Sequence, residues 1–409
     1  MKNNLNIIIV NDFSYIEGGA SKVAIKSAIE LKKAGYNVVF FSAVKPISTE
    51  LINNNIKVLS TEQFDIAKDK NRVRAFFQGI WNNKAEKAIR ELLKEYSERN
   101  TLVHIHSWEK ALSTSCIKVS TDMKFKTLIT LHDYEIVCPN GGFYNYNTKE
   151  ICYLKPMSKE CILCNCDSRK YIYKIWRLVR QNKQIRSGQL PSKVKNYIYL
   201  SQISKKVLKP HLPQDAKFYY VKNPVDVKKE KPVDTKNNNN YIYIGRLSKE
   251  KGCLLFAKAA KELNLNATFI GDGELKDEII SIYPKARVTG WLGKNEIKEE
   301  LKNARVLVFP SLWYEGLPLT VMESLSVGVP VVLSDTCTAT EVVKDKETGL
   351  WFKRGELEDL KEKIKTMMNN NLVEIYSKNA YENYWENDFS LENHVNQLEK
   401  VYKDILERG

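Results

Sequence analysis

Two glutamates occupy positions at which a carboxylate could bind a sugar. Glu315 lies in a loop that contains glycine and proline, directly after the apolar run Arg305–Phe309, and Glu323 follows in an otherwise apolar helical stretch. Each carboxylate can accept a pair of hydrogen bonds from vicinal hydroxyls, one on a transferred sugar and the other on a ribose. The helix entrance between them presents backbone N–H groups to an anion. Its residues are Gly316, Leu317, Pro318 and Leu319.

Cations and glycines follow other strand-like runs. Arg246 and Lys251 lie between the run Tyr241–Ile244 and the next helical stretch, where they could bind phosphate oxygens or form a solvated loop. Glycine pairs at two further strand ends would let the backbone turn tightly or approach a phosphate, and either pair alone is also typical of a plain turn. These pairs are Gly18 with Gly19, and Gly271 with Gly273.

Three histidines end strands in the first half of the chain. His132 follows the run Thr127–Leu131, and His104 and His106 lie in the segment HIHSW at the end of another run. A single histidine at a strand end is usually structural. We therefore keep both interpretations, core and acceptor pocket, for His104 and His106.

The elements that would position these residues form two α/β domains. Short runs that are apolar on both faces alternate with amphipathic helical stretches, a pattern typical of parallel sheets covered by helices. A polar segment rich in Pro and Asn, Val221–Asn240, separates two such series. The predicted strands are Leu5–Val10, Val38–Phe41, Leu102–Ile105, Thr127–Leu131 and Tyr197–Leu200, then Tyr241–Ile244, Thr268–Ile270, Val306–Phe309 and Val331–Leu333.

Charge differs between the two halves. Residues 1–222 hold 37 Lys and Arg against 19 Asp and Glu, whereas residues 223–409 hold 27 against 30. Such asymmetry indicates that the first domain meets an anionic partner, either nucleic acid or membrane. On a helix, segment 169–180 would place Tyr171, Ile172, Ile175, Trp176 and Val179 opposite Lys170, Lys174 and Arg177, as an interfacial helix or as a helix packed on the core.

Five of the eight cysteines fall within residues 138–166. Four thiolates that include one Cys-x2-Cys pair can close a structural zinc site and hold a loop that has no core of its own. Free thiols and a redox role are the alternatives. The predicted zinc ligands are Cys138, Cys152, Cys161 and Cys164.

At this point the sequence resembles glycosyltransferase family 4, the retaining enzymes of the GT-B fold, from Ile7 to about Leu406. The resemblance rests on EGGASKVA, YIGRLSKEKG, GDGEL, GWLGKNEI and YEGLPLTVMESLSVGVPVV, which occur in that order. It implies a nucleotide-sugar donor carrying UDP or GDP and a reaction that needs no metal cofactor. The residues implied as catalytic are His132, Glu315, Arg246 and Lys251; those implied as donor-binding are Gly18, Gly19, Arg246, Lys251, Gly271, Gly273, Leu292, Glu315, Gly316, Leu317, Pro318, Leu319 and Glu323.

The resulting expectation is a GT-B glycosyltransferase whose two doubly wound domains face a cleft. We expect an acceptor-binding domain over 1–222 that contains the cysteine-rich insert at 138–166, a donor-binding domain over 223–385, and a closing helix within 386–409 that packs back on the first domain. The acceptor would be lipid-linked or another saccharide, and the protein cytoplasmic and peripheral on the inner face of the cell membrane. An inactive scaffolding relative, a nucleic-acid-binding protein and a nucleotide-sugar epimerase are the alternatives; the absence of a recognised nucleic-acid module argues against the second.

Overall fold

The computed structural model describes residues 4–407 and forms two compact units. The first unit consists of Met1–Gly142, Leu154–Pro224 and Ser390–Gly409, of which residues 1–3 and 408–409 lie outside the described part. The second consists of Phe143–Tyr153 and Val225–Phe389. A segment of the predicted cysteine-rich insert, Phe143–Tyr153, thus belongs with the second unit.

The first unit is built on a parallel sheet of seven strands in the order β3-β2-β1-β4-β5-β8-β9. Its central strand β1 reads NIIIV, and Ile7, Ile8 and Ile9 are all fully buried because both faces of the sheet are covered. The strands are β1 (Asn6–Val10), β2 (Asn37–Val44), β3 (Lys57–Gln63), β4 (Thr101–Ile105), β5 (Lys126–Leu131), β8 (Asn196–Tyr199) and β9 (Lys217–Tyr220).

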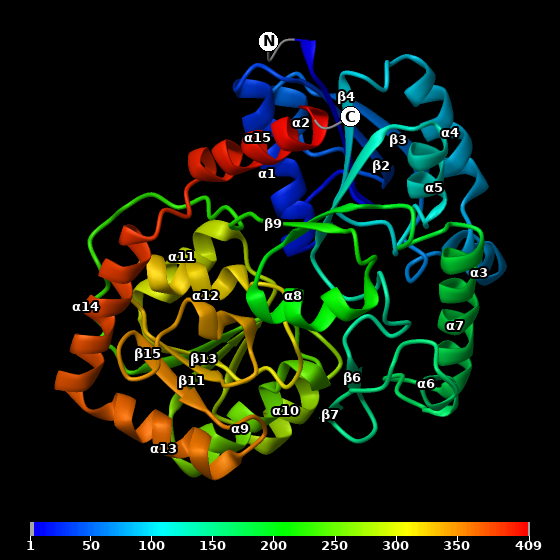
Figure 1. Ribbon diagram of the computed structural model, residues 1–409. Coiled ribbons are helices and arrows are strands. Elements are labelled where there is room, and N and C mark those ends of the chain that lie inside the picture. Colours follow the sequence, from blue (N-terminus) through cyan, green and yellow to red (C-terminus); the bar gives the residue numbers. More distant parts are fainter. Residues whose placement is uncertain (1–3, 408–409) are drawn as a thin grey trace. The chain divides into compact units, whose positions relative to one another are not determined.

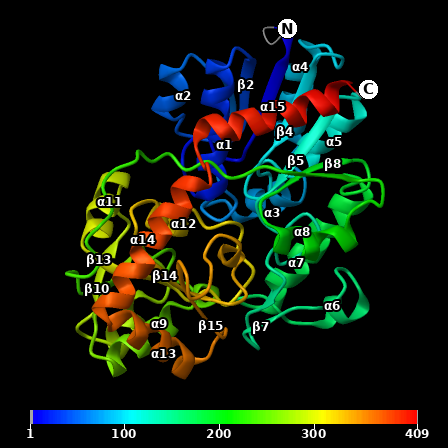
Figure 2. The same cartoon turned by 60° about the vertical axis from the view of Figure 1, so that its left-hand side comes forward.

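Helices connect these strands and cover the sheet (Figure 1). The closing helix α15 packs against α1, and Tyr402 of α15 reaches the sheet, where its hydroxyl lies 2.8 Å from Nδ1 of His104. Both views show α1 and α15 side by side (Figure 2). The helices are α1 (Gly19–Lys33), α2 (Thr49–Asn53), α3 (Arg72–Ile80), α4 (Asn83–Lys94), α5 (Ser115–Asp122), α6 (Lys159–Leu163), α7 (Tyr171–Arg186), α8 (Gln202–Leu208), η2 (Lys209–His211) and α15 (Leu391–Glu407).

The second unit is built on a parallel sheet of six strands in the order β12-β11-β10-β13-β14-β15. On one face, Tyr241 and Tyr243 of β10 share a core with Phe256 and Phe269. The strands are β10 (Asn240–Ile244), β11 (Asn266–Ile270), β12 (Arg287–Gly290), β13 (Ala304–Phe309), β14 (Val331–Ser334) and β15 (Gly349–Phe352).

The remaining elements of this unit are helices that cover the sheet and a separate two-stranded hairpin. Helix α9 packs against α10 and α13, and α12 packs against α14. A short antiparallel hairpin, β6 (Tyr144–Asn145) and β7 (Glu150–Ile151), comes from the 143–153 segment. The helices are η3 (Lys249–Lys251), α9 (Cys253–Glu262), α10 (Lys276–Ile282), α11 (Lys294–Lys302), α12 (Leu319–Ser326), η4 (Thr338–Glu341), α13 (Leu357–Met368) and α14 (Asn370–Glu386).

Both sheets have the doubly wound topology that the sequence predicts. Within residues 4–407, none of the helices combines the length and the apolar composition required to cross a membrane.

Candidate functional site

In the second unit, the chemistry-bearing loops gather at one edge of the sheet. The connections run outward from β10 in one direction through β11 and β12, and from β13 in the other direction through β14 and β15, so the topology reverses between β10 and β13. Ligands of open α/β sheets bind at the carboxyl ends of the strands beside such a reversal. Lys251 follows β10 and Glu315 follows β13, so this edge carries the two predicted donor loops.

Lys251 and Glu315 form a close ion pair at that reversal. The Lys251 ammonium lies 2.8 Å from both carboxylate oxygens of Glu315, and the hydroxyl of Ser311 donates to one of them at 2.5 Å. Glu315 is buried, and the Lys251 side chain is only 18% exposed. The sequence interpretation gave the two residues separate ligands, whereas the structure shows that each is the other's counterion. A phosphate that binds Lys251 must therefore share it with Glu315.

Arg246 lies in a loop that the neighbouring turn holds in place. Two backbone hydrogen bonds join the loops, from Gly245 N–H to Ile270 and from Leu247 N–H to the carbonyl of Asp272. At Gly271, φ is +141° and an added Cβ would lie 2.0 Å from the Gly245 carbonyl oxygen. The first glycine in GDGEL is therefore required for packing, while the Arg246 side chain is exposed.

The other predicted donor residues occupy the same edge of this unit. Glu323 is half-buried within α12, whose first residue is Leu319, and Leu292 follows β12. The hydroxyl of Thr338 donates to the carbonyl of Gly316 and fixes the helix entrance. The structure thus brings the Lys251 and Glu315 side chains into contact and places Arg246, Leu292 and Glu323 on connections at this edge.

The hairpin segment 143–153 packs beside the Glu315 loop. Arg354 donates to the carbonyls of Lys149 at 3.4 Å and Leu312 at 3.3 Å, and its guanidinium also pairs with Glu150. No sequence pattern predicts this contact, because Lys149, Leu312 and Arg354 are 163 and 42 residues apart and no motif joins them. Arg354 is a residue of the candidate site that the sequence analysis missed.

In the first unit, the topology reverses between β1 and β4, and predicted site residues again lie at that point. Gly18 and Gly19 follow β1, His106 follows β4, and His132 follows the adjacent strand β5. At Gly18 the backbone is extended, with φ 179°, and an added Cβ would have no heavy atom within 4 Å. Neither strain nor packing therefore requires glycine at this position, which leaves room for a ligand.

The histidines form a row at the ends of β4 and β5, in which His104 and His106 are buried and His132 is half-buried. Nδ1 of His106 lies 3.0 Å from Nε2 of His132, and the two rings stack with centroids 5.3 Å apart. His104 instead bonds to Thr130 at 2.7 Å and to Tyr402, so it joins two strands to α15 as a core residue. His106 and His132, in contrast, both line a small pocket of this unit, together with Trp108, Glu109 and Asp133.

Burial keeps these rings neutral. It lowers the pKa of His104 and of His132 to about 3, and it lowers the pKa of His106 well below its ordinary value. Because both partners are neutral, one ring donates an N–H to the other in the His106–His132 hydrogen bond. Nε2 of His106 is buried without a hydrogen-bond partner among the described residues. The pocket therefore presents an uncharged hydrogen-bonding group to any ligand.

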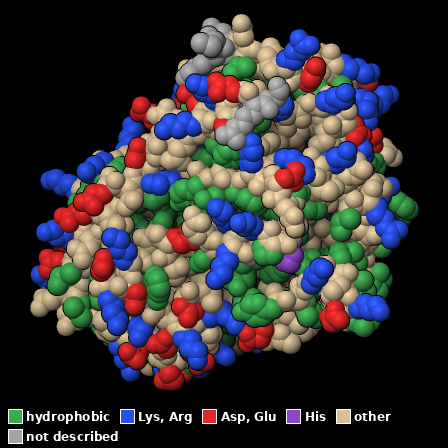
Figure 3. Space-filling view, in the orientation of Figure 1, with side chains coloured by type: hydrophobic (Ala, Val, Ile, Leu, Met, Phe, Trp, Pro, Cys, Tyr) green, Lys and Arg blue, Asp and Glu red, His purple; other side chains and the backbone are tan. Residues whose placement is uncertain are grey.

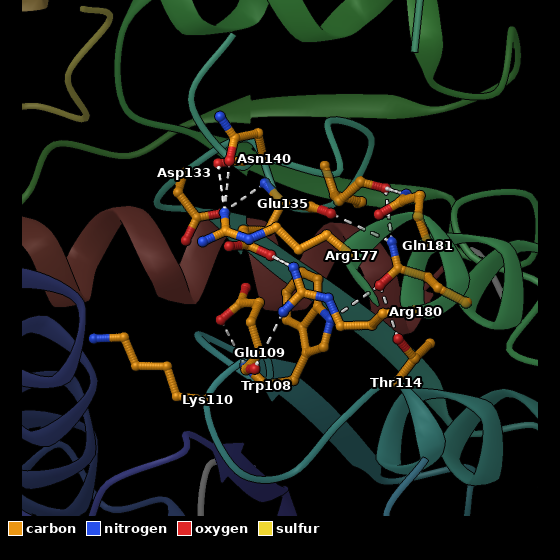
Figure 4. A network of polar contacts seen from close by, with 12 residues as sticks. Trp108, Glu109, Lys110, Thr114, Asp133, Glu135, Asn140, Arg177, Arg180 and Gln181 are labelled. Carbon is orange, nitrogen blue, oxygen red and sulfur yellow. Dashed lines mark hydrogen bonds and ion pairs between the residues drawn. The ribbon is translucent and has the colours of Figure 1, made fainter. Parts of the chain in front are cut away.

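A polar network fixes the loops that carry the two histidines (Figure 4). The Asp12 carboxylate accepts from the backbone N–H groups of Lys110, Ala111 and Leu112 at 2.8–3.0 Å, which holds the loop after β4. Arg180 of α7 pairs with Glu135 in the loop after β5 and donates to the carbonyl of Glu109 at 3.5 Å.

Glu109 and Asp12 are acidic residues that the sequence analysis did not single out. Desolvation and then the charges of Asp133 and Asp12 raise the pKa of Glu109 well above its ordinary value. Glu109 lies three residues after His106, and Asp133 directly follows His132. The signal available in the sequence was this placement of carboxylates next to strand-end histidines.

The orientation of α7 contradicts the interpretation in which its apolar face packs on the core, and the interfacial interpretation stays a prediction. Lys174 is 1% exposed, and the inward face also carries Gln181 and Gln184, which donate to the carbonyl of Ile136 at 3.3 and 2.9 Å. Ile172, Ile175 and Val179 are exposed. The helix therefore buries part of its polar face against the histidine-bearing loops and turns apolar side chains outward, because those loops need polar partners.

The predicted structural zinc is not supported. Among residues 4–407, no group of three or more His, Cys, Asp or Glu side chains is arranged to hold a metal ion. The ammonium of Lys174 lies 3.1 Å from the sulfur of Cys166 and 3.7 Å from that of Cys161, and a cation in this position disfavours a second one beside the same thiols. Of the predicted ligands, Cys152 belongs to the second unit, and Cys138, Cys161 and Cys164 belong to the first.

Known proteins resemble parts of the chain. Residues 225–383 match the family described as Glycosyl transferases group 1. The chain is 28% identical over 216 residues to the UDP-Gal:alpha-D-GlcNAc-diphosphoundecaprenol alpha-1,3-galactosyltransferase of Escherichia coli, a match that covers 46% of this chain and 55% of that protein. It is 26% identical over 171 residues to the N,N'-diacetylbacillosaminyl-diphospho-undecaprenol alpha-1,3-N-acetylgalactosaminyltransferase of Campylobacter jejuni, covering 40% of this chain and 45% of that one.

The whole fold has solved counterparts. HepE of Anabaena, determined in complex with UDP and glucose, superimposes with a TM-score of 0.70 at 14% identity, covering 98% of this chain and 100% of HepE. The matches to the curated relatives, by contrast, span about half of their length. The solved counterparts confirm the predicted GT-B fold, and residues 225–383 match a glycosyltransferase family. Membership of family 4 in particular stays a prediction.

Proposed function

We propose that the protein is a retaining glycosyltransferase that moves a sugar from a UDP- or GDP-linked donor to a lipid-linked saccharide of a surface glycan. The observation that carries this proposal is the Lys251–Glu315 pair at the topological reversal of the second unit, inside the range that matches the glycosyltransferase family. Two relatives are named for transfer to diphosphoundecaprenol-linked sugars, and a structural counterpart binds UDP with glucose, which supports both substrate classes.

The donor would bind along the edge of the second sheet. Arg246 and Lys251 would neutralise the diphosphate together with the backbone N–H groups at the start of α12, and Glu323 would accept hydrogen bonds from the ribose. Glu315 would hold the Lys251 ammonium and accept from a hydroxyl of the sugar. Such preorganised cations and dipoles stabilise a departing nucleoside diphosphate without requiring a metal cofactor.

The acceptor would bind to the first unit, beside His106 and His132. Because burial holds the pKa of His132 at about 3, this ring would act as a neutral hydrogen-bonding group that orients a sugar hydroxyl. The extended, unobstructed backbone at Gly18 would let the substrate approach the start of α1. No acid–base step is assigned to the histidines, since neutral rings with such low pKa values do not take up a proton near pH 7.

The proposal is tested by binding and turnover of donor-site variants. Lys251→Ala and Arg246→Ala should each weaken UDP or GDP binding and reduce turnover at least tenfold, since each removes a charge-assisted hydrogen bond that contributes roughly 1.5–3 kcal/mol. Glu315→Gln should reduce sugar transfer more than binding of the bare nucleotide. Glu323→Gln should damage nucleotide binding itself. Calorimetry with a panel of nucleotides and nucleotide sugars, followed by transfer to a polyprenyl-diphosphate sugar, gives both quantities.

Lys344→Ala is the matched control, because Lys344 is 60% exposed and pairs with Glu347 on the surface of the same unit. It should leave binding and turnover unchanged. Normal turnover in both the Arg246 and the Lys251 variants would refute the donor site. Donor hydrolysis without transfer to any polyprenyl-linked acceptor would keep the donor site and refute the acceptor class.

A further inference from the structure

Helices α3 and α7 both turn large apolar side chains toward solvent. On α3, Val73 is 68% and Phe77 is 64% exposed; on α7, Ile172 is 62% and Val179 is 47% exposed. The inward residues of α3 are small or polar, namely Ala75, Gln78 and Gly79. An apolar surface of this extent on two adjacent helices marks an interaction site.

The two helices form one continuous surface. Trp176 of α7 donates from its indole nitrogen to the carbonyl of Phe76 at 3.2 Å, and the two rings lie 6.4 Å apart. A Cβ at Gly79 would lie 2.5 Å from the Trp176 ring, which shows how closely the helices pack. We name the outer patch the surface formed by Phe64, Val73, Phe76, Phe77, Ile172, Tyr173, Ile175 and Val179. Figure 3 shows hydrophobic side chains at the right-hand edge, where Figure 1 places α3 and α7.

The exposed charges on the two segments that form the outer patch are positive, although exposed Glu62 and Glu160 flank these segments. Lys68, Arg74 and Arg169 pair with Glu17, Asp69 and Asp167. Segments 64–80 and 162–186 contain three acidic residues, Asp65, Asp69 and Asp167, and all three are buried. The exposed charged residues of these segments are Lys68, Lys70, Arg72, Arg74, Arg169, Lys170 and Arg186, all cations. Two of these cations lie over aromatic rings of the patch: Arg169 is 3.8 Å from the ring of Tyr173, and Arg74 is 5.4 Å from that of Phe64.

We propose that the outer patch inserts into the interface of a bilayer that contains anionic lipid, with aromatic and aliphatic side chains among the acyl chains and the cations on the headgroups. Aromatic side chains surrounded by Lys and Arg suit this environment, in which apolar burial and electrostatic attraction add. A second copy of the chain fits less well, because a two-fold contact would bring the same cationic rim against itself. The proposal does not depend on glycosyl transfer.

The orientation of α7 gives the contact a structural consequence. The face of α7 opposite the outer patch holds the loops after β4 and β5 through Arg180 and Gln184. The same helix would thus touch lipid on one side and support His106 and His132 on the other. This arrangement suits an acceptor whose sugar is attached to a membrane lipid.

Vesicle sedimentation of the full chain tests the proposal. The wild type should bind vesicles of phosphatidylcholine mixed with phosphatidylglycerol, and high salt should lower the bound fraction without abolishing it, because salt screens only the charges. Phe77→Ser combined with Ile172→Ser should bind at least tenfold more weakly at every salt concentration. Lys70→Gln combined with Arg186→Gln should bind at least threefold more weakly, and only at low salt.

The matched control combines Leu372→Ser with Ile375→Ser, exposed apolar residues of α14 that lie outside the patch. It should bind vesicles as the wild type does. All variants should keep the wild-type melting temperature and UDP affinity, so a failure of the donor proposal would not affect this test. Wild-type binding by the patch variant, no binding of the wild type at low salt, or a concentration-dependent dimer that the patch variant alone abolishes would each overturn the proposal.

Discussion

At the scale of single residues, the first unit is distinguished by histidines that burial keeps uncharged. His394 of α15 is 4% exposed and bonds to Ser27 and to the carbonyl of Lys222, each at 2.8 Å, and burial lowers its pKa to about 4. Burial also lowers the pKa of His104, His106, His132 and His211, so all five histidines share this condition. Each must release its proton before the unit can fold.

The lowered pKa values of these histidines predict that the protein loses stability on acidification at pH values that are still above 4. The unfolded chain binds a proton at each histidine near pH 6.5, whereas the folded chain does so at His104, His132 and His394 only near pH 3 to 4. Because the unfolded state therefore binds more protons in this window, the free energy of unfolding should fall as the pH falls below about 6.5. The slope should reach about 1.4 kcal/mol per pH unit for each buried histidine. Urea titrations between pH 8 and about pH 5 measure it.

His104→Gln provides the comparison. Removing one of these histidines should lower the slope of unfolding free energy against pH by the contribution of about one bound proton. This change should appear whatever the substitution does to the absolute stability. A stability that does not change between pH 7.5 and 5.5, about one unit either side of the ordinary histidine pKa, would contradict this account of the histidine row.

At the scale of helices and strands, the central strands are predictable and the edge strands are not. Each of the nine predicted runs lies in or overlaps a strand of the structure. Six strands within residues 4–407 were not predicted: β3, β9, β12 and β15 are the outermost strands of the two parallel sheets, and β6 and β7 form the separate hairpin. An edge strand has fewer neighbours to bury it, so β3 reads KVLSTEQ and β12 reads RVTG, without the continuous apolar run that marks a central strand.

Helix α7 shows a different limit of prediction. Its pattern separates apolar from basic residues correctly, but the pattern cannot tell which face is buried. The buried face of α7 is determined by interactions with residues elsewhere in the chain. Arg180 forms an ion pair with Glu135, and Gln184 donates a hydrogen bond to the carbonyl of Ile136. Periodicity gives an amphipathic helix, and only the tertiary contacts give its orientation.

Three glycines at loops and helix starts should respond differently to alanine. Gly271→Ala should cost well over 1 kcal/mol of unfolding free energy, because φ is +141° and the Cβ would lie 2.0 Å from a carbonyl oxygen. Gly355→Ala should cost only about 1–2 kcal/mol, since φ is +79° and nothing lies within 4 Å. Gly18→Ala should leave stability unchanged. Chemical denaturation of the three variants measures these costs.

Gly18→Ala also separates folding from binding. If a substrate approaches this backbone, the variant should lose acceptor or donor affinity while its denaturation curve stays that of the wild type. An equal loss of stability in the Gly18 and Gly271 variants would show that the loop after β1 is packed more tightly than the structure indicates.

At the scale of the whole molecule, the donor motifs were predictable and their contacts were not. Lys251 follows β10, Glu315 follows β13, and Glu323 lies in α12 directly after the Glu315 loop, so the doubly wound topology alone brings these segments to one edge. The ion pair between Lys251 and Glu315, the Asp12 loop support and the Arg354 contacts join segments 42 to 205 residues apart. No local pattern encodes such pairs.

Arg354 therefore yields a prediction about the second unit. Its side chain is 19% exposed and ties the hairpin segment to the Glu315 loop through the carbonyls of Lys149 and Leu312. Arg354→Ala should release the hairpin segment and the Glu315 loop from each other. Limited proteolysis should then cut the chain near residue 148 faster, and the affinity for UDP should fall at least threefold. Arg287→Ala is the control, because Arg287 also pairs with a glutamate but lies on the edge strand β12. Unchanged cleavage and affinity in Arg354→Ala would show that the hairpin is held by other contacts.

The hairpin segment also bears on how chimaeric enzymes should be assembled. Phe143–Tyr153 lies between stretches of the first unit in the chain yet packs with the second. An exchange of the first unit with a relative's at a single junction near Val225 would carry a foreign hairpin onto Arg354. A chimaera that keeps residues 143–153 native, and exchanges the flanking stretches and the closing helix together, would preserve the packing of both units.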